Sequence, residues 1–124
     1  ASALRKCAVP FGVSGPAQAA AIAALACEPQ LLMRVAAITA ERKRVIDGLR
    51  LQGWATPDSQ GNFVWLRLGS ETKSFSEFCT TYALSVRSYG VDGVRITIGE
   101  VAANDRFLDV AREFQESVRV GDGS

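Results

Sequence analysis

The sequence predicts an α/β domain of the α+β kind, with a small antiparallel sheet of about three to four strands covered on one face by helices. Two observations support this fold class. Short segments alternate apolar and polar residues, as strands do, and longer segments repeat apolar residues at helical spacing. Because 124 residues are enough for one domain with its own core, we expect an open-faced sandwich. Its uncovered sheet face is where we expect the function.

The N-terminal third is predicted to be helical. We interpret residues 1–7 as the end of a helix that Pro10 and Gly12 break. Pro16 suits the first turn of a second helix over residues 18–27, because the first turn needs no proline N–H. Since the chain does not begin with methionine, we expect it to be a fragment of a longer protein.

A third helix, the longest, is expected to open at Pro29 and to end before Gly53. A charged cluster, residues 41–44 with Asp47, should form a solvated face with local ion pairs. The apolar residues that share one stripe of this helix are Leu31, Val35, Ile38, Val45 and Leu49.

The middle of the chain predicts a hairpin and a short helix. Residues 54–57 are expected to form a short strand that pairs with a strand over residues 62–68. Ser74 followed by Glu77 has the form of a capping box, so we expect a helix over residues 75–84.

The last third predicts two more strands, residues 85–89 and 94–98, which should pair antiparallel across the Gly90 and Gly93 turn. A final helix should follow, capped by Asn104 or Asp105. We expect residues 121–124 to be a disordered tail. The apolar residues at helical spacing in the final helix are Phe107, Val110, Ala111, Phe114 and Val118.

Composition excludes several kinds of partner and site. The formal net charge is +1 with both signs interspersed, so we expect no nucleic acid and no membrane as a partner. The chain has no histidine, which rules out a histidine triad and removes the commonest general base and the commonest metal ligand. Three widely separated cysteines, Cys7, Cys27 and Cys79, predict small buried thiols in a reducing cytoplasm.

Arg95 is the candidate binding residue. Side chains alternate across a strand, so Val94 and Ile96 face the core while Arg95 faces the opposite way. A guanidinium keeps its charge and binds carboxylate or phosphate at two points. Arg87, on the neighbouring strand, could reach the same anion. A solvated arginine on an exposed strand remains the alternative for both residues.

Two segments of the chain resemble pyridoxal-phosphate aminotransferases of the histidinol-phosphate aminotransferase type. One is the strand of Arg95 with the Asn104-Asp105 pair that follows it, and the other is LRKCAVPFGVSGPAQAAAIAAL, residues 4–25. Gly12 within VPFGVS makes the chain more similar to the branch that acts on phenylalanine and other aromatic amino acids. The resemblance implies that residues 1–15 are the end of an interdomain helix and a hinge, and that residues 16–120 are the small C-terminal domain.

The resemblance also implies an activity. The intact enzyme would transfer an amino group between histidinol phosphate or an aromatic amino acid and a 2-oxo acid, in amino-acid biosynthesis, as a cytoplasmic homodimer. It further implies that Arg95 binds the acidic group of the substrate, that Arg87 assists, and that Phe11, in the hydrophobic loop at the domain entrance, lines the substrate pocket. A plain hydrophobic hinge remains the alternative for Phe11.

The family's cofactor, pyridoxal phosphate, is held as a Schiff base by a lysine of the large domain. The stretch Thr72-Lys73-Ser74-Phe75 superficially resembles that lysine motif but lacks the glycine and arginine that should follow. We therefore expect no catalytic, cofactor-binding or metal-binding residue in this chain, and no activity from the chain alone. A function of another class, a stand-alone regulatory or protein-interaction domain with an open sheet, remains the alternative.

Overall fold

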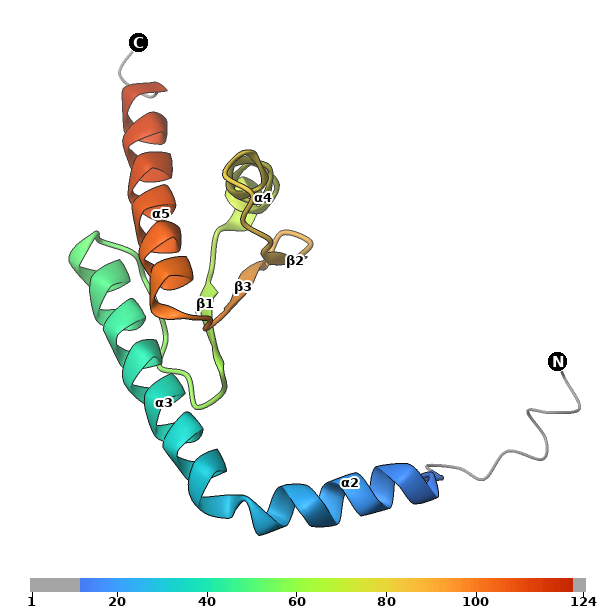
Figure 1. Ribbon diagram of the computed structural model, residues 1–124. Coiled ribbons are helices and arrows are strands. Elements are labelled where there is room, and N and C mark those ends of the chain that lie inside the picture. Colours follow the sequence, from blue (N-terminus) through green and yellow to red (C-terminus); the bar gives the residue numbers. More distant parts are fainter. Residues whose placement is uncertain (1–11, 122–124) are drawn as a thin grey trace, which may run out of the picture. The chain divides into compact units, whose positions relative to one another are not determined.

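A computed structural model describes residues 12–121 of the chain (Figure 1). The described residues fall into two units, and the boundary between them follows Arg34. The elements in chain order are α2 (Gly15–Ala26), α3 (Glu28–Leu51), β1 (Phe63–Leu66), the 3-10 helix η1 (Gly69–Glu71), α4 (Thr72–Thr81), β2 (Arg87–Tyr89), β3 (Gly93–Thr97) and α5 (Val101–Gly121).

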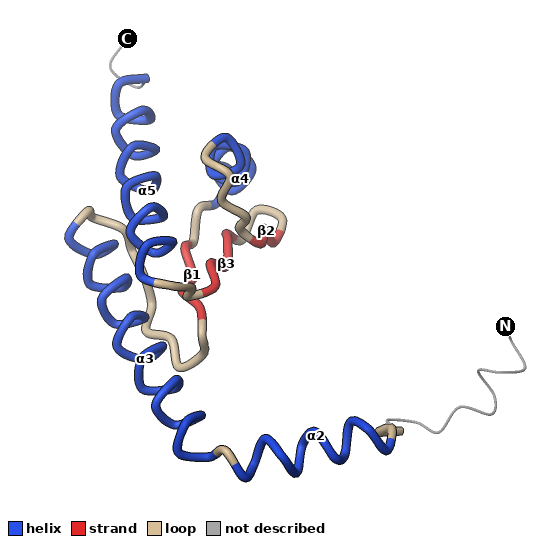
Figure 2. The backbone as a smooth tube through the Cα atoms, viewed as in Figure 1, coloured by secondary structure: helices blue, strands red, loops and turns tan. Residues whose placement is uncertain are grey.

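The three strands form one small antiparallel sheet in the order β1-β3-β2 (Figure 2). This confirms the predicted sheet and the predicted pairing of the last two strands. Gly93 lets β1 and β3 approach each other, because a Cβ at this position would lie 2.0 Å from the Leu66 carbonyl oxygen. Its φ of +145° is also a conformation that side-chain-bearing residues rarely adopt.

Helices cover one face of this sheet, as predicted. The core contains residues from α3, β1, α4, β3 and α5. At its centre the fully buried Phe75 ring packs edge-on against Trp54 and Phe114, with ring centroids 5.7 and 5.0 Å apart. Such edge-to-face pairs add to the stabilisation that comes from burying the rings. The buried apolar side chains of the two longer strands are Val64, Leu66, Val94 and Ile96.

The helix α2 begins earlier than predicted, at Gly15. Ser14 is its N-cap, with the Ser14 hydroxyl accepting a hydrogen bond from the Ala17 N–H, and Pro16 lies in the first turn as expected. No residue of α2 is buried. Across the described residues no single helix is long and apolar enough to cross a membrane, and α2 and α3 meet that length and composition criterion only as a bent pair.

The long helix α3 follows the prediction closely. It ends at Leu51, and Gly53 has φ +94°, which is suited to a helix stop. The predicted local ion pairs are present, Arg44 with Glu41 and Lys43 with Asp47. The predicted apolar stripe is buried only in part: Val45 and Leu49 lie in the core, whereas Leu31, Val35 and Ile38 are exposed.

The predicted strand over residues 54–57 is wrong, and so is its hairpin, because β1 pairs with β3 instead. Backbone polar groups of this segment form hydrogen bonds with residues at the end of α3 instead. The Trp54 N–H donates to the Leu49 carbonyl oxygen. The Arg50 guanidinium donates to the Thr56 carbonyl oxygen at 2.9 Å. These bonds replace the strand pairing that the sequence pattern indicates.

The predicted capping box is also wrong. The helix α4 begins at Thr72, directly after η1, so Ser74 lies inside it and its hydroxyl donates to the Glu71 carbonyl oxygen. Glu77 lies near Lys73 instead of reaching back to a cap. The helix ends before residue 84, where the left-handed φ of +56° at Ala83 marks the turn into the next segment.

The last helix begins at Val101, so neither Asn104 nor Asp105 is its N-cap. Asn104 instead lies in the first turn, and its side chain hydrogen-bonds back to both backbone groups of Gly99. Because α5 includes Gly121 and residues 122–124 lie outside the described part, the disorder of the tail stays a prediction.

The cysteines of the described part differ in their exposure to solvent. Cys79 is buried, as predicted, and burial raises the pKa of its thiol to about 11. Cys27 is exposed, contrary to the prediction, because it lies in the turn between α2 and α3, where none of the described side chains covers it. Cys7 lies outside the described residues.

Candidate functional site

The candidate site is the face of the sheet that the helices leave uncovered. Residues that alternate with the buried ones must point to this face. It is built by all three strands, and its side chains, called the open face below, are Phe63, Trp65, Arg87, Tyr89, Arg95 and Thr97.

Arg95 lies on the central strand of the open face. In the register of the sheet it is opposite Trp65 on one side and opposite Arg87 on the other. The side chain is half-buried, and its Cζ lies 5.5 Å from the centroid of the Phe63 ring. Its Nε is buried without a hydrogen-bond partner. Arg95 therefore presents a positive charge with an unused donor, whereas most arginines of α3 and α5 are engaged by carboxylates or carbonyl oxygens.

Arg87 is exposed and stacks in a similar way, with its Cζ 5.3 Å from the centroid of the Tyr89 ring. The Tyr89 ring packs edge-on against Trp65 at 5.5 Å. Each guanidinium thus lies over an aromatic face, a cation–π arrangement that favours an ordered arginine. The structure brings the two predicted arginines to directly opposed positions, and their binding of one anion stays a prediction.

The aromatic rings of the open face were not among the predicted site residues. The alternation in residues 62–68 was the available signal, because it places Phe63 and Trp65 on the face opposite Val64 and Leu66. Phe11, the third predicted site residue, lies outside the described residues. A shallow hollow of about 400 Å³ adjoins Trp65, and Arg67 and Asp92 line it.

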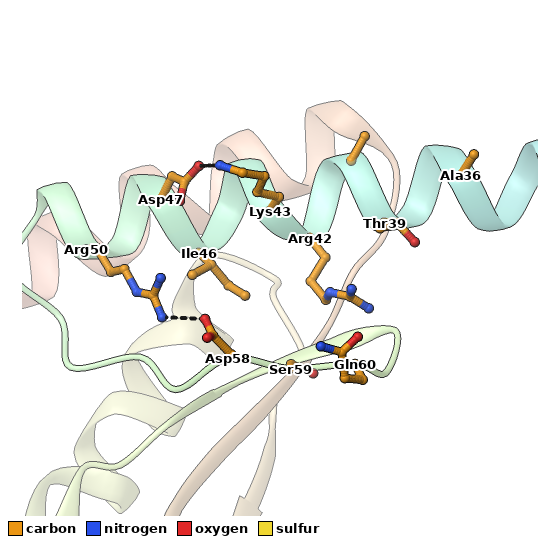
Figure 3. Close-up of a pocket in the computed structure, with 11 residues that line it drawn as sticks. Ala36, Thr39, Arg42, Lys43, Ile46, Asp47, Arg50, Asp58, Ser59 and Gln60 are labelled. Carbon is orange, nitrogen blue, oxygen red and sulfur yellow. Dashed lines mark hydrogen bonds and ion pairs between the residues drawn. The ribbon is translucent and has the colours of Figure 1, made fainter.

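A larger groove of about 640 Å³ lies elsewhere, between α3 and residues 58–60 (Figure 3). Its charged side chains already have partners. Arg50 pairs with Asp58 at 2.8 Å, and Lys43 pairs with Asp47, as the dashed lines in Figure 3 show. Arg42, the remaining charged residue, donates to the Gly61 carbonyl oxygen at 2.7 Å. Because no residue of the open face lines this groove and each of its charged side chains already has a partner, we assign no anion site to it.

A polar cluster holds the segment that follows β3. Asn104 is 4% exposed and donates to Glu41 on α3, 63 positions away in the sequence, at 2.9 Å. Glu41 also accepts hydrogen bonds from Arg44, and Arg44 pairs with Asp105 on α5 at 2.7 Å. The Arg44 hydrogen bond, followed by that of Asn104, lowers the pKa of the Glu41 carboxyl below its usual value. The cluster therefore links α3, α5 and the exit of the strand that carries Arg95.

The described residues do not fit a pyridoxal-phosphate site. A Schiff base needs a lysine that is free to react, but Lys43 is paired with Asp47 and Lys73 lies 3.8 Å from Glu77. Both lysines are on exposed helix surfaces, with side chains 77% and 86% exposed. Within residues 12–121 there is also no group of His, Cys, Asp or Glu side chains that could hold a metal ion.

The comparisons with known proteins all point to one protein family. Residues 1–110 match the model of aminotransferase class I and II. The chain is 53% identical over 118 residues to an aromatic amino acid aminotransferase of Streptomyces coelicolor, and the match covers 95% of the chain and 33% of that protein. An aromatic amino acid aminotransferase of Mycobacterium tuberculosis is 48% identical over 114 residues, which cover 92% of the chain and 32% of that protein.

A solved structure shares the fold. It is a Burkholderia pseudomallei protein assigned provisionally as an aminotransferase, with a TM-score of 0.76 and 25% sequence identity over 91% of this chain and 36% of that one. The chain thus spans about a third of the length of the relatives it matches. On these findings, the chain belongs to the aminotransferase class I and II family.

Proposed function

We propose that this chain is the small-domain part of a pyridoxal-phosphate-dependent aminotransferase that transfers an amino group between an aromatic amino acid and a 2-oxo acid. The family match and the names of the relatives support this substrate class. They favour aromatic amino acids over histidinol phosphate, the other substrate that the sequence pattern allows. The cofactor would be held by a large domain, since the lysines of the described part are engaged on helix surfaces.

The observation that supports this most directly is the position of Arg95 on the central strand of the open face, half-buried and beside the Phe63 ring. Because its Nε is buried, a substrate carboxylate would bind to the terminal nitrogens of the guanidinium. These nitrogens donate charge-assisted hydrogen bonds. Arg87, at the opposed position, would place a second positive charge beside the same anion.

The aromatic rings of the open face suit the rest of the substrate. Phe63 and Trp65 flank Arg95, so an aromatic amino acid bound through its carboxylate would lie near apolar ring surface. We include Phe11 in this pocket as part of the proposal. Binding at this face would orient the substrate toward a cofactor held by the neighbouring domain, and domain closure would exclude water.

The remaining features of the enzyme belong to the same proposal. We place it in the cytoplasm, which suits the free thiols of Cys27 and Cys79, and we propose that it works as a homodimer. The chain by itself should be inactive. Incubation of the chain with pyridoxal phosphate, phenylalanine and 2-oxoglutarate tests this, and any enzymatic transamination would contradict it.

The role of Arg95 is testable in a chimera in which this chain replaces the matched third of the Streptomyces coelicolor enzyme. We expect Arg95→Ala to raise the activation free energy for kcat/KM with phenylalanine by about 2–5 kcal/mol. This corresponds to a loss of kcat/KM of about 30-fold to several thousandfold. Arg95→Lys should recover only part of the loss, because an ammonium keeps the charge but not the planar fork.

Arg112→Ala is the matched control, because Arg112 is an arginine on α5 paired with Asp109 on the surface. We expect this variant to retain the kinetic constants of the chimera. If Arg95→Ala also retained them, Arg95 would not bind substrate and the proposed site would be wrong.

A further inference from the structure

We infer that Phe63 is a positioning residue for Arg95: its ring orders the guanidinium so that the terminal nitrogens are held ready for a carboxylate. A positioning residue acts through another side chain, so this role differs from the apolar surface that the ring offers to the substrate. The inference rests on the proposed function and deepens it, because it names the residue that determines how the carboxylate site is presented.

Phe63 and Arg95 are diagonal neighbours on the open face. Phe63 on β1 is opposite Thr97 of β3, whereas Arg95 is opposite Trp65. Diagonal neighbours in an antiparallel pair are about 7–8 Å apart, which an aromatic ring and a long side chain can span. The Arg95 Cζ accordingly lies over the Phe63 ring, 5.5 Å from its centroid. This distance is within the limit of about 6 Å for a cation–π contact, which favours one orientation of the guanidinium.

The ring itself lies on a fixed backbone. A Cβ at Gly61 would be 2.6 Å from the ring Cε1 atom, so the ring packs directly on the backbone of residue 61. The Gly61 carbonyl oxygen accepts a hydrogen bond from Arg42 of α3 at 2.7 Å. The next carbonyl oxygen, of Asn62, accepts one from the Ile98 N–H at 2.8 Å. Because this backbone is bonded to α3 on one side and to the end of β3 on the other, the ring has a fixed place from which to orient the guanidinium.

The surroundings of Arg95 make such support necessary. Arg87 is at the directly opposed position and repels it. Within residues 12–121 no carboxylate forms an ion pair with Arg95. A long side chain loses rotamer freedom when it binds a ligand, and ordering it beforehand removes part of that cost. Removal of the ring should therefore weaken carboxylate binding even though the positive charge remains.

The test compares two competitive inhibitors, 3-phenylpropionate and its neutral amide, in the chimera of this chain with the Streptomyces coelicolor enzyme. They share the aromatic ring and differ in the carboxylate, so the ratio of their inhibition constants measures what the carboxylate alone contributes. We expect Phe63→Leu to lower the advantage of the carboxylate by about 5- to 30-fold, the size of a cation–π contact at a partly buried site. Any direct contact of Phe63 with the ring of the inhibitor cancels in this ratio. An unchanged ratio would overturn the inference.

Two further variants separate positioning from packing. Phe63→Tyr keeps the aromatic face and should retain the ratio. Phe78→Leu is the matched control, because Phe78 is also a half-buried ring but packs against Tyr82 and Phe114 and not against an arginine. It should leave the ratio unchanged. An equal fall in Phe78→Leu would overturn the inference, since the effect would then come from loosened packing.

A second measurement does not depend on activity. In the chain itself, NMR relaxation of the Arg95 Nε–H group reports how far this side chain is ordered on the picosecond-to-nanosecond timescale. The resonance is identified by its loss in Arg95→Lys. We expect an ordered group in the unmodified chain and a mobile one in Phe63→Leu, and equal order in both would overturn the inference. If order is lost in Phe63→Leu but Arg95→Ala retains the kcat/KM of the chimera, the positioning is right and the proposed function is wrong, so the two failures are distinguishable.

Discussion

Replacement of Asn104 by alanine removes a buried amide that connects three parts of the fold. Its Nδ2 donates to Glu41 Oε2 at 2.9 Å and to the Gly99 carbonyl oxygen at 3.0 Å. Its Oδ1 accepts from the Gly99 N–H at 3.0 Å. The change therefore separates α3 from α5 at one contact and releases the segment that follows β3.

The magnitude follows from these bonds. A hydrogen bond to a charged group contributes about 1.5–3 kcal/mol and a neutral one about 1 kcal/mol. The sum for three bonds is an upper limit, because Gly99 is exposed and water can replace the amide there. We expect Asn104→Ala to lower the free energy of unfolding by about 2–3 kcal/mol.

Urea unfolding of the chain, followed by tryptophan fluorescence and extrapolated linearly, measures this difference. The control is Asp105→Asn, one position along α5, which removes an ion pair between Arg44 and a carboxylate that is 52% exposed. An exposed pair contributes about 0–1 kcal/mol, so this variant should be close to the unmodified chain. If Asn104→Ala cost no more than Asp105→Asn, the reasoning about the buried amide would be wrong.

Three further predictions concern the core and its ionisable groups. Phe75→Ala should lower the free energy of unfolding by about 3–5 kcal/mol, because it leaves a cavity beside Phe114, and a loss below about 1 kcal/mol in the same urea assay would contradict this. The hydrogen bond to Glu113 raises the pKa of Tyr82. The stability that this bond contributes to the fold should therefore be present below pH 10 and be lost as the pH rises through the raised pKa. Spectrophotometric titration of phenolate should show one tyrosine that ionises at higher pH than the other, and Tyr82→Phe should remove it. The hydrogen bond from Arg44 lowers the pKa of Glu41. The stability that this bond contributes to the fold should be present above the usual carboxyl pKa and be lost as the pH falls through the lowered value. In Glu41→Gln the free energy of unfolding should depend less on pH in this acid range.

Local sequence patterns predict correctly those elements that are determined by contacts between residues close together in the sequence. The pairing of β2 with β3 followed from two alternating segments around a glycine turn, and the end of α3 followed from Gly53. The strand predicted over residues 54–57 failed because its backbone bonds are set by α3, through Arg50 and the Leu49 carbonyl oxygen. Local alternation gives no information about such a contact.

The sequence predicts only those site residues whose side-chain direction follows from alternation along a single strand. Alternation placed Arg95 away from the core, and the short turn placed Arg87 on the neighbouring strand. The ring of Phe63 beneath Arg95 depends on the register of β1 against β3, which two segments about 30 residues apart in the sequence do not specify by themselves. The sequence predicts Asn104 as an N-cap, which is wrong because the last helix begins at Val101. It does not indicate the bond to Glu41, because that contact joins residues 63 positions apart.

The open face has a physical property that its covered counterpart lacks. Arg87 and Arg95 occupy directly opposed positions in an antiparallel pair, an arrangement in which like charges destabilise the sheet. The rings of Tyr89 and Phe63 offset part of this repulsion through cation–π contacts. An anion bound between the two guanidiniums would replace repulsion by two attractive contacts, so it would bind the folded sheet and not the unfolded chain. If the proposed function is right, substrate binding and the stability of this sheet would be linked through the same two residues, as for any ligand that binds only the native state.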